Sequence, residues 1–179
     1  MHLFRTRKQR GFTLIELLVV VAIIGIVAVI LIPNLLDALQ KAKQKKTVGT
    51  IRDVGMAWFS WMTDEVSSAA AGSNQFDYSG LVTVQFNDLA NLLIPAVGAR
   101  YASSVPKKDS WGNPFDYATA PDLGTASQGI AVRSWGRDAQ EGPTMAPYPM
   151  GPFIVTHYAE DIVWSDGFFV RYPAGVEAN

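Results

Sequence analysis

The chain of 179 residues predicts an α+β fold in which a long N-terminal helix packs on a small antiparallel sheet. The first observation is an almost uninterrupted apolar run over residues 12–32, after which helical spacing of apolar residues continues to about residue 71. The second is a series of short strand-like segments between turn residues in the remainder, residues 72–179. We therefore expect one membrane segment, one amphipathic helical segment (33–71) and one C-terminal globular domain.

The apolar run has the length of a single membrane span. Only Thr13, Glu16 and Gly25 interrupt it, and 21 residues at about 1.5 Å each reach about 30 Å, the thickness of a bilayer core. Basic residues precede it, as in a secretion signal, but the run is too long for an ordinary signal peptide and ends at Pro33 without a small-residue cleavage site. Lysines 41, 43, 45 and 46 balance the charge on the other side, so charge alone leaves the orientation open. We expect these lysines to form a solvated face near the lipid headgroups.

Composition excludes several functions. The net charge is −1, and removal of the first 11 residues with their four basic side chains would leave −5. An acidic soluble part argues against binding to nucleic acid, which requires a basic patch. The chain has no cysteine, which excludes disulfides, zinc–thiolate sites and thiol catalysis. His157 is a lone histidine outside the N-terminal leader, and no nucleophile or phosphate-binding motif accompanies it, so no enzyme is predicted.

The helical segment after the apolar run is amphipathic. One apolar stripe recurs at three- and four-residue steps through Ile51, Val54, Trp58, Trp61, Met62 and Val66. Gly49 and Gly55 weaken the expectation that this half is unbroken. Pro33 removes a backbone donor and crowds the carbonyl of Val29, and Gly25 lowers helix propensity further, so residues 25–33 form the weakest part of the helix.

Short elements are expected in the C-terminal domain. Residues 87–95 predict a helix with Asn87 as its N-cap, Asp88 in its first turn and Pro95 as its stop. Strands are expected at 114–118, 129–135, 162–164 and 168–172, with the last two joined by a hairpin turn at residues 165–167. The apolar stripe around Trp58 should cover one face of their sheet.

The segment Gly11-Phe12-Thr13-Leu14-Ile15-Glu16, between a basic leader and an apolar helix, resembles the prepilin signal of type IV pilins and type II secretion pseudopilins. This resemblance implies that a prepilin peptidase removes the leader, residues 1–11, by cutting after Gly11. Phe12 would then become the N-methylated N-terminus. It also implies a bacterial inner-membrane protein that crosses the membrane once, with the C-terminal domain in the periplasm.

Glu16 is a carboxylate within the expected membrane span, where a charge costs about 2.5–3.5 kcal/mol. Cleavage before Phe12 creates an amine with a pKa near 8 at the i, i+4 position, within reach in the same helix. The resemblance implies instead that the partner is the Phe12 amine of a neighbouring subunit, so that docking neutralises both charges and sets the register. It also implies that the stretch from Gly25 to Pro33 can unwind in the filament. The alternatives are a Glu16 side chain that reaches the membrane interface and a simple kink at Pro33.

Two later stretches, VPKKDSWGNPFDY (105–117) and SWGRDAQEG (134–142), resemble the major pseudopilin of type II secretion. In that family the second stretch and a later aspartate bind calcium. The resemblance implies that Trp135 offers its backbone carbonyl, that Asp138 is a carboxylate ligand, and that Asp161 is the later ligand. Trp135 and Ala139 depart from the leucine and glycine of the family pattern, and Glu141 or Glu160 are alternatives for the later ligand.

The sequence is thus interpreted as a structural subunit of a type IV pilin-like filament, closest to the major pseudopilin. Expected partners are further copies of the chain, the prepilin peptidase, an inner-membrane assembly platform with its motor ATPase, minor pseudopilins and the membrane. The alternatives are a subunit of a true type IV pilus, a membrane-tethered periplasmic binding module or adhesin, and a tethered enzyme.

Overall fold

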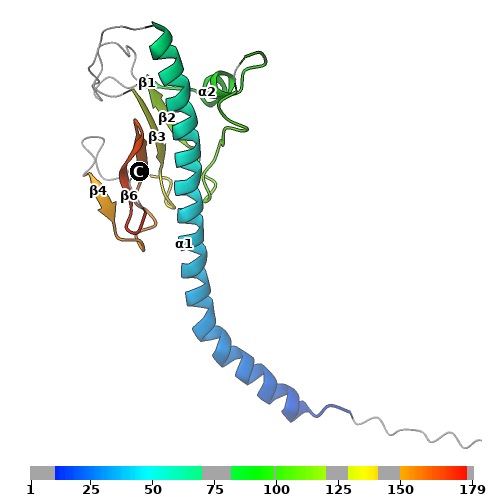
Figure 1. Cartoon of the computed structure of the whole chain (residues 1–179). Helices are drawn as coiled ribbons and strands as arrows, with labels where there is room; N and C mark the ends of the chain where they lie inside the picture. The colour runs from blue at the N-terminus through cyan, green and yellow to red at the C-terminus, as the bar shows by residue number, and fades with distance from the viewer. Residues whose placement is uncertain (1–10, 70–81, 99, 120–128, 141–149, 177–179) are drawn as a thin grey trace, which may run out of the picture. The chain divides into compact units, whose positions relative to one another are not determined.

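The computed structural model describes residues 11–69, 82–98, 100–119, 129–140 and 150–176 (Figure 1). It divides between Leu39 and Gln40 into two units, each of which is described by itself. Helix α1 (Leu14–Ala69) supplies residues to both, and the second unit adds helix α2 (Phe86–Leu93). The strands of the second unit are β1 (Val82–Thr83), β2 (Asp116–Thr119), β3 (Ile130–Ser134), β4 (Gly151–Phe153), β5 (Ile162–Ser165) and β6 (Phe168–Pro173).

The first unit is an apolar helix without a covering layer. Every Leu, Ile, Val and Phe side chain from Phe12 to Leu39 is exposed, with Leu14 at 88% and Leu39 at 48%. In the described part of the chain, α1 is the one helix long and apolar enough to cross a membrane. A helix that is apolar on all sides needs lipid or other apolar helices around it.

The expected weak stretch is helical in the single chain. Helix α1 continues through Gly25 and Pro33, and the side-chain amide of Asn34 donates a hydrogen bond to the Ile30 carbonyl at 3.3 Å. This bond lies beside the position where Pro33 lacks a backbone donor. Unwinding of this stretch within a filament stays a prediction.

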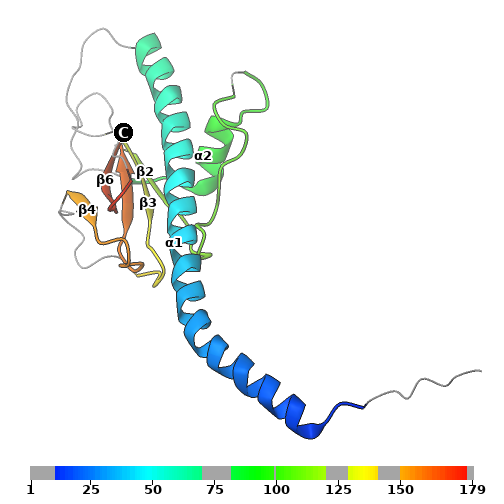
Figure 2. The same ribbon diagram turned by 60° about the horizontal axis from the view of Figure 1, so that its bottom comes forward.

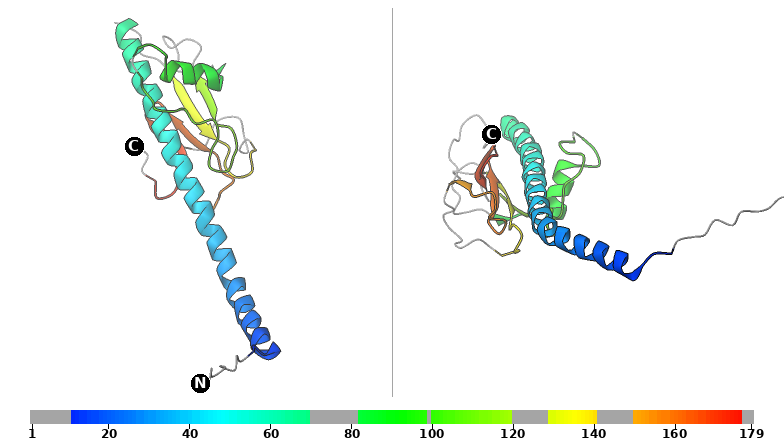
Figure 3. Two further views of the ribbon diagram at one scale, coloured as in Figure 1. Left: turned by 90° about the vertical axis from the view of Figure 1, so that its right-hand side faces the viewer. Right: turned by 90° about the horizontal axis from the view of Figure 1, so that it is seen from below.

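In the second unit, the part of α1 that begins at Gln40 packs along a six-stranded sheet of order β1-β2-β3-β5-β6-β4. Figures 2 and 3 show the sheet on one side of this helical segment, with α2 beside the helix. Four of the strand pairings are antiparallel, as expected, but β4 lies parallel to β6 and makes the sheet mixed. Both edges of β5 are occupied, by β3 and by β6, and β4 pairs with the remaining edge of β6.

The hairpin between β5 and β6 forms at the expected turn. Asp166 and Gly167 both have positive φ, 48° and 103°, which matches a two-residue turn of the primed type. The Asp166 carboxylate accepts hydrogen bonds from the backbone amides of Gly129 (3.1 Å) and Ile130 (3.0 Å). Burial raises the pKa of this carboxyl group above its ordinary value. The turn therefore also holds the start of β3.

The core joins the helix stripe to one face of the sheet. Ile51, Val54, Trp58 and Met62 of α1 are buried, as the apolar spacing predicts, whereas Trp61 is only partly buried. Val48, which the predicted stripe did not include, is buried with them. Trp58 meets the Tyr117 ring edge to face, with the ring centres 6.3 Å apart. Burying a large apolar side chain stabilises the fold by about 1.5–3 kcal/mol.

The start of α2 differs from the expectation. The helix begins at Phe86 with Gln85 at the N-cap position, two residues before the expected cap Asn87. The reason is packing, because Phe86 is partly buried against the core and joins the helix. Asp88 lies in the first turn, as expected. The expected end of the long helix at residues 72–74 lies outside the described residues.

Gly55 is a contact position and not a weak point of the helix. A Cβ atom added to Gly55 would lie 2.6 Å from the indole ring of Trp164, and that indole is fully buried. Gly49, two turns earlier, has nothing within 4 Å of the same position. Both glycines lie inside one unbroken helix, but only at Gly55 does a neighbouring side chain leave no room for a Cβ atom.

We predict that Gly55→Ala destabilises the chain by about 1–3 kcal/mol, because the added methyl group overpacks the Trp164 site. Gly49→Ala is the matched control and should stabilise the helix by up to about 1 kcal/mol, because alanine has the higher helix propensity. Thermal unfolding of the full-length chain in detergent, followed by circular dichroism, measures both changes. Equal effects of the two substitutions would contradict the close approach at Gly55.

Candidate functional site

The N-terminal site is built around the first turn of α1. The Glu16 carboxylate oxygen Oε2 accepts hydrogen bonds from the backbone amide (2.9 Å) and the hydroxyl (2.6 Å) of Thr13. In return, the backbone amide of Glu16 donates to the Thr13 hydroxyl at 3.3 Å. This reciprocal pair is a capping box, which satisfies amides that the helix itself leaves without acceptors. Gly11 and Phe12 precede the helix and are exposed.

Thr13 is the residue whose role the sequence analysis missed. The signal was present, because Thr13-x-x-Glu16 before an apolar run is the pattern of a capping box. In this chain the carboxylate of Glu16 is thus directed back over the helix N-terminus toward the segment that contains Phe12. Its pairing with an amine on a neighbouring subunit stays a prediction.

A second candidate site lies between β3 and β5. Trp135 and Asp138 belong to the loop after β3, and Asp161 directly precedes β5. The Arg137 amide donates to the Tyr158 carbonyl at 2.7 Å, which joins this loop to the segment before Asp161. The carbonyl oxygens of Tyr158 and Glu160 both lie 2.8 Å from the position of a Cβ on Gly136. The structure therefore brings together the two stretches that contain the three predicted ligands.

The residues of this loop fit a hard cation. Asp138 is exposed and accepts from the Gln140 amide at 3.2 Å, whereas Asp161 is only 2% exposed. Ala139 keeps φ at +56°, the left-handed conformation that glycine adopts most easily and that explains the glycine of the family pattern. Carboxylate and carbonyl oxygens are the donors that calcium prefers.

Backbone atoms would have to contribute to such a site. Among the described residues, no group of three or more His, Cys, Asp or Glu side chains is arranged to hold a metal ion. The alternative ligand Glu141 lies outside the described residues, and Glu160 forms an ion pair with Arg171 at 2.8 Å. Glu160 is therefore engaged elsewhere, and Asp161 stays the predicted later ligand.

The indole of Trp135 is engaged by Asp116 and Arg133 and does not face a metal ligand role. Its Nε1 donates to Asp116, which also accepts from Arg133, and the Arg133 guanidinium lies 5.3 Å from the centre of the Trp135 ring. This cluster fixes the direction of residue 135 at the end of β3. It leaves the backbone carbonyl as the atom of Trp135 that can serve a cation.

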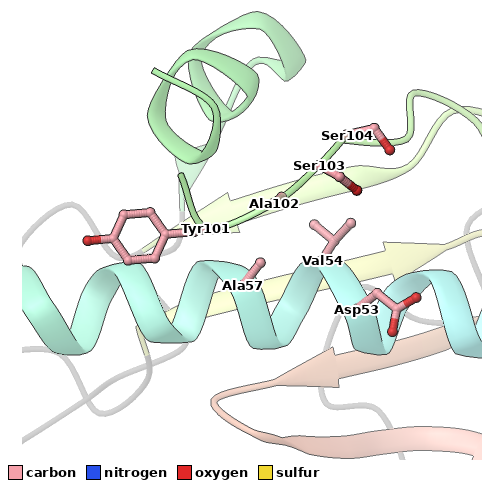
Figure 4. Close-up of a pocket in the computed structure, with 7 residues that line it drawn as sticks. All are labelled: Asp53, Val54, Ala57, Tyr101, Ala102, Ser103 and Ser104. Carbon is pink, nitrogen blue, oxygen red and sulfur yellow. The ribbon is translucent and has the colours of Figure 1, made fainter. Parts of the chain in front are cut away.

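A surface pocket of about 250 Å³ lies between α1 and the chain after α2 (Figure 4). It is lined by Asp53, Val54, Ala57, Tyr101, Ala102, Ser103 and Ser104. The Tyr101 hydroxyl donates to Asp64 at 2.9 Å. Of the lining residues, Tyr101, Ser103 and Ser104 carry hydroxyl groups, but the lining includes no histidine or lysine to activate them. The pocket therefore gives no support to an enzymatic function.

Comparisons with known proteins find similarity over most of the chain. Residues 6–32 match the prokaryotic N-terminal methylation motif. The type II secretion system core protein G of Vibrio cholerae is 37% identical over 138 residues, which cover 77% of this chain and 87% of that protein. The type IV wide pilus major component PilA4 of Thermus thermophilus is 33% identical over 129 residues, 72% of this chain and 94% of that protein. No solved structure gives a significant match.

The methylation motif, the long helix packed on a small sheet and these identities define the class: the chain belongs to the type IV pilin-like family of filament subunits. Within the family it is similar to core protein G pseudopilins, including that of Pseudomonas aeruginosa (31% identity over 136 residues, 76% of this chain and 89% of that protein). The prediction of a structural pilin-like subunit is confirmed. Membership implies assembly of copies into a filament and processing by a prepilin peptidase.

We predict that Thr13→Val increases amide hydrogen exchange in the first turn of α1 about fivefold, because loss of an N-cap hydroxyl costs about 1 kcal/mol. Thr13→Ser keeps the hydroxyl and should leave exchange unchanged. Exchange of residues 14–17 in detergent micelles, measured by NMR, checks both variants. Equal exchange rates in Thr13→Val and Thr13→Ser would contradict the capping box.

Proposed function

We propose that the chain is the major pseudopilin of a type II secretion system. It is made in the bacterial inner membrane with its C-terminal domain in the periplasm, and the leader is removed after Gly11 with N-methylation of Phe12. A separate motor ATPase and an inner-membrane platform drive assembly, minor pseudopilins join the filament, and the chain itself performs no catalysis.

The observation that carries this proposal is the exposed apolar part of α1, from Leu14 to Leu39. Side chains of this kind are stable in two places, the hydrocarbon of a membrane and a bundle of similar helices. A filament subunit occupies both environments, because it is held in the membrane before assembly and then packs its helix against the helices of its neighbours. The identities to core protein G proteins over most of the chain support the secretion system as the setting.

Glu16 selects the register in this mechanism. A charged carboxylate among apolar helices is costly unless an opposite charge meets it. The amine of Phe12 on an adjacent subunit supplies that charge after cleavage. Subunits that dock out of register leave both charges buried without a partner, so the electrostatic cost rejects them.

We further propose that the C-terminal domain binds calcium through the Trp135 carbonyl and the carboxylates of Asp138 and Asp161. The close packing of Gly136 on the carbonyls of Tyr158 and Glu160 supports this proposal. Calcium takes six to eight oxygen ligands, and when bound it would join two segments of a domain that has no disulfide.

A type IV pilus subunit is the second candidate, and the similarity to the pilins of Thermus thermophilus and Myxococcus xanthus favours it. Deletion of the gene in its own host separates the two functions, because one loses protein secretion and the other loses surface pili. A tethered binding module would keep residues 1–11 in the intact mass of the expressed protein.

We predict that Glu16→Gln is processed normally but lowers filament yield by more than about a hundredfold, because breaking a buried ion pair costs about 3–5 kcal/mol. Co-expression with the peptidase, intact mass and electron microscopy measure processing and assembly separately. Asp53→Asn, which removes an exposed carboxylate, is the control and should assemble normally. Normal filaments of Glu16→Gln would exclude the proposed register mechanism.

We predict that calcium raises the melting temperature of the chain, by the equivalent of about 2.7 kcal/mol when its concentration is a hundredfold above Kd. Asp138→Asn should lose most of this increase, and Asp53→Asn should keep it. Differential scanning calorimetry in calcium and in chelator makes the comparison. The calcium proposal fails if wild type and Asp138→Asn respond alike.

A further inference from the structure

The turn formed by residues 109–113, here called the WGN turn, is held by a buried carboxylate. Asp109 is 8% exposed, and its Oδ1 accepts hydrogen bonds from the amides of Trp111 and Asn113, both at 2.9 Å. The Asp109 amide donates to the Asn113 carbonyl at 2.8 Å, and Gly112 has φ of +99°. The turn is therefore a rigid unit whose shape depends on Asp109.

One side of the WGN turn is bonded to α1. The Trp111 indole Nε1 donates to the Gln40 side chain at 2.7 Å, and the Ser110 amide donates to the Thr47 hydroxyl at 3.2 Å. Gln40, Gln44 and Thr47 share one face of the helix at i, i+4 and i+7 spacing. Gln44 and Thr47 are almost fully buried, at 1% and 0% exposure. The turn is thus part of the packing of this helical segment.

The other side of the WGN turn is bonded to the loop that contains the candidate calcium ligands. The Ser134 hydroxyl donates to Asp109 Oδ2 at 2.8 Å, and the Gly136 amide donates to the Ser134 hydroxyl at 3.3 Å. The Asn113 side-chain amide donates to the Gly136 carbonyl at 2.7 Å. Residues 134 and 136 are consequently held by the same turn that holds α1.

We propose that the WGN turn couples calcium binding in the 134–138 loop to the packing of the Gln40–Thr47 segment of α1, with Asn113 as the positioning residue. The proposal rests on the proposed calcium site. Ordering of the loop by a cation fixes the Gly136 carbonyl, Asn113 transmits that position to the turn, and Trp111 transmits it to Gln40. Gln40 follows the expected membrane span by eight residues, so the coupling acts on the helix that the filament uses.

Thermodynamic reciprocity means that the coupling can be measured in two ways, as ordering of the helix segment by calcium and as a change in the affinity for calcium. If calcium orders the helix segment, then cutting the connection must also weaken calcium binding by the same factor. Loss of one hydrogen bond of this kind corresponds to about a fivefold change in an equilibrium constant. Asn113→Ala is therefore expected to bind calcium about fivefold more weakly than wild type.

Hydrogen exchange of the full-length mature chain in detergent, with saturating calcium and with chelator, tests the coupling. In wild type, calcium should slow exchange both at residues 134–138 and at residues 40–47. In Asn113→Ala, saturating calcium should still slow exchange at 134–138, but its effect at 40–47 should be smaller than in wild type, because one of the two bonds from the loop to the turn is lost. Trp111→Phe, which removes the indole donor to Gln40, should give the same result, and the exposed Asn91→Ala control should behave as wild type.

Two results would overturn the coupling: equal calcium protection of 40–47 in wild type and Asn113→Ala, or wild-type protection confined to 134–138. Isothermal titration with calcium chloride tests the calcium site separately. If wild type binds no calcium, the metal proposal fails. The samples in chelator then test whether the WGN turn links the 134–138 loop to the 40–47 helix segment without a metal. Asn113→Ala must then accelerate exchange at both 134–138 and 40–47, and unchanged exchange at 40–47 would exclude the coupling.

Discussion

One helix must satisfy two different apolar environments, and this constraint organises the whole chain. From Leu14 to Leu39 the Leu, Ile and Val side chains of α1 are exposed on all sides. From Val48 to Met62 they form a single stripe that is buried against the sheet. The second part of the helix is therefore a layer of the domain core and cannot leave without unfolding the domain. The first part keeps its apolar surface for lipid and for other copies of the helix.

Close packing and polar bonds act together where the domain meets its part of α1. At Gly55 the backbone of the helix approaches the buried Trp164 ring so closely that a methyl group has no room. At the WGN turn, Asp109 collects backbone amides and the Ser134 hydroxyl into one buried network. Buried carboxylates require such donors, because an uncompensated charge in the interior is expensive. In the WGN turn, Asp109 is needed to accept these hydrogen bonds, and Asn113 is needed to donate one to the Gly136 carbonyl.

The sequence predicted the elements that depend on local patterns. Helix α1 followed from apolar periodicity, and the β5–β6 hairpin followed from Asp166-Gly167 between two apolar runs. Strand β4 could not be found this way, because it has three residues including Pro152, and its partner is set by the free edge of β6. At the candidate site, the family resemblance implied Asp138 and Asp161 as ligands, but it did not give the contacts that join their two segments. The Asn113–Gly136 bond spans 23 residues and leaves no local pattern in the sequence.

The capping box changes how the carboxylate of Glu16 is understood. In the single chain the charge is already stabilised by the Thr13 amide and hydroxyl, so part of its hydrogen bonding is satisfied without a neighbouring subunit. Both bonds end on Oε2, and an ionised carboxylate can accept about four hydrogen bonds in total. Capping of its own helix and pairing with an incoming ammonium are therefore compatible. Because capping turns the carboxylate toward the helix N-terminus, it also directs the charge to the end of the chain where cleavage creates the amine.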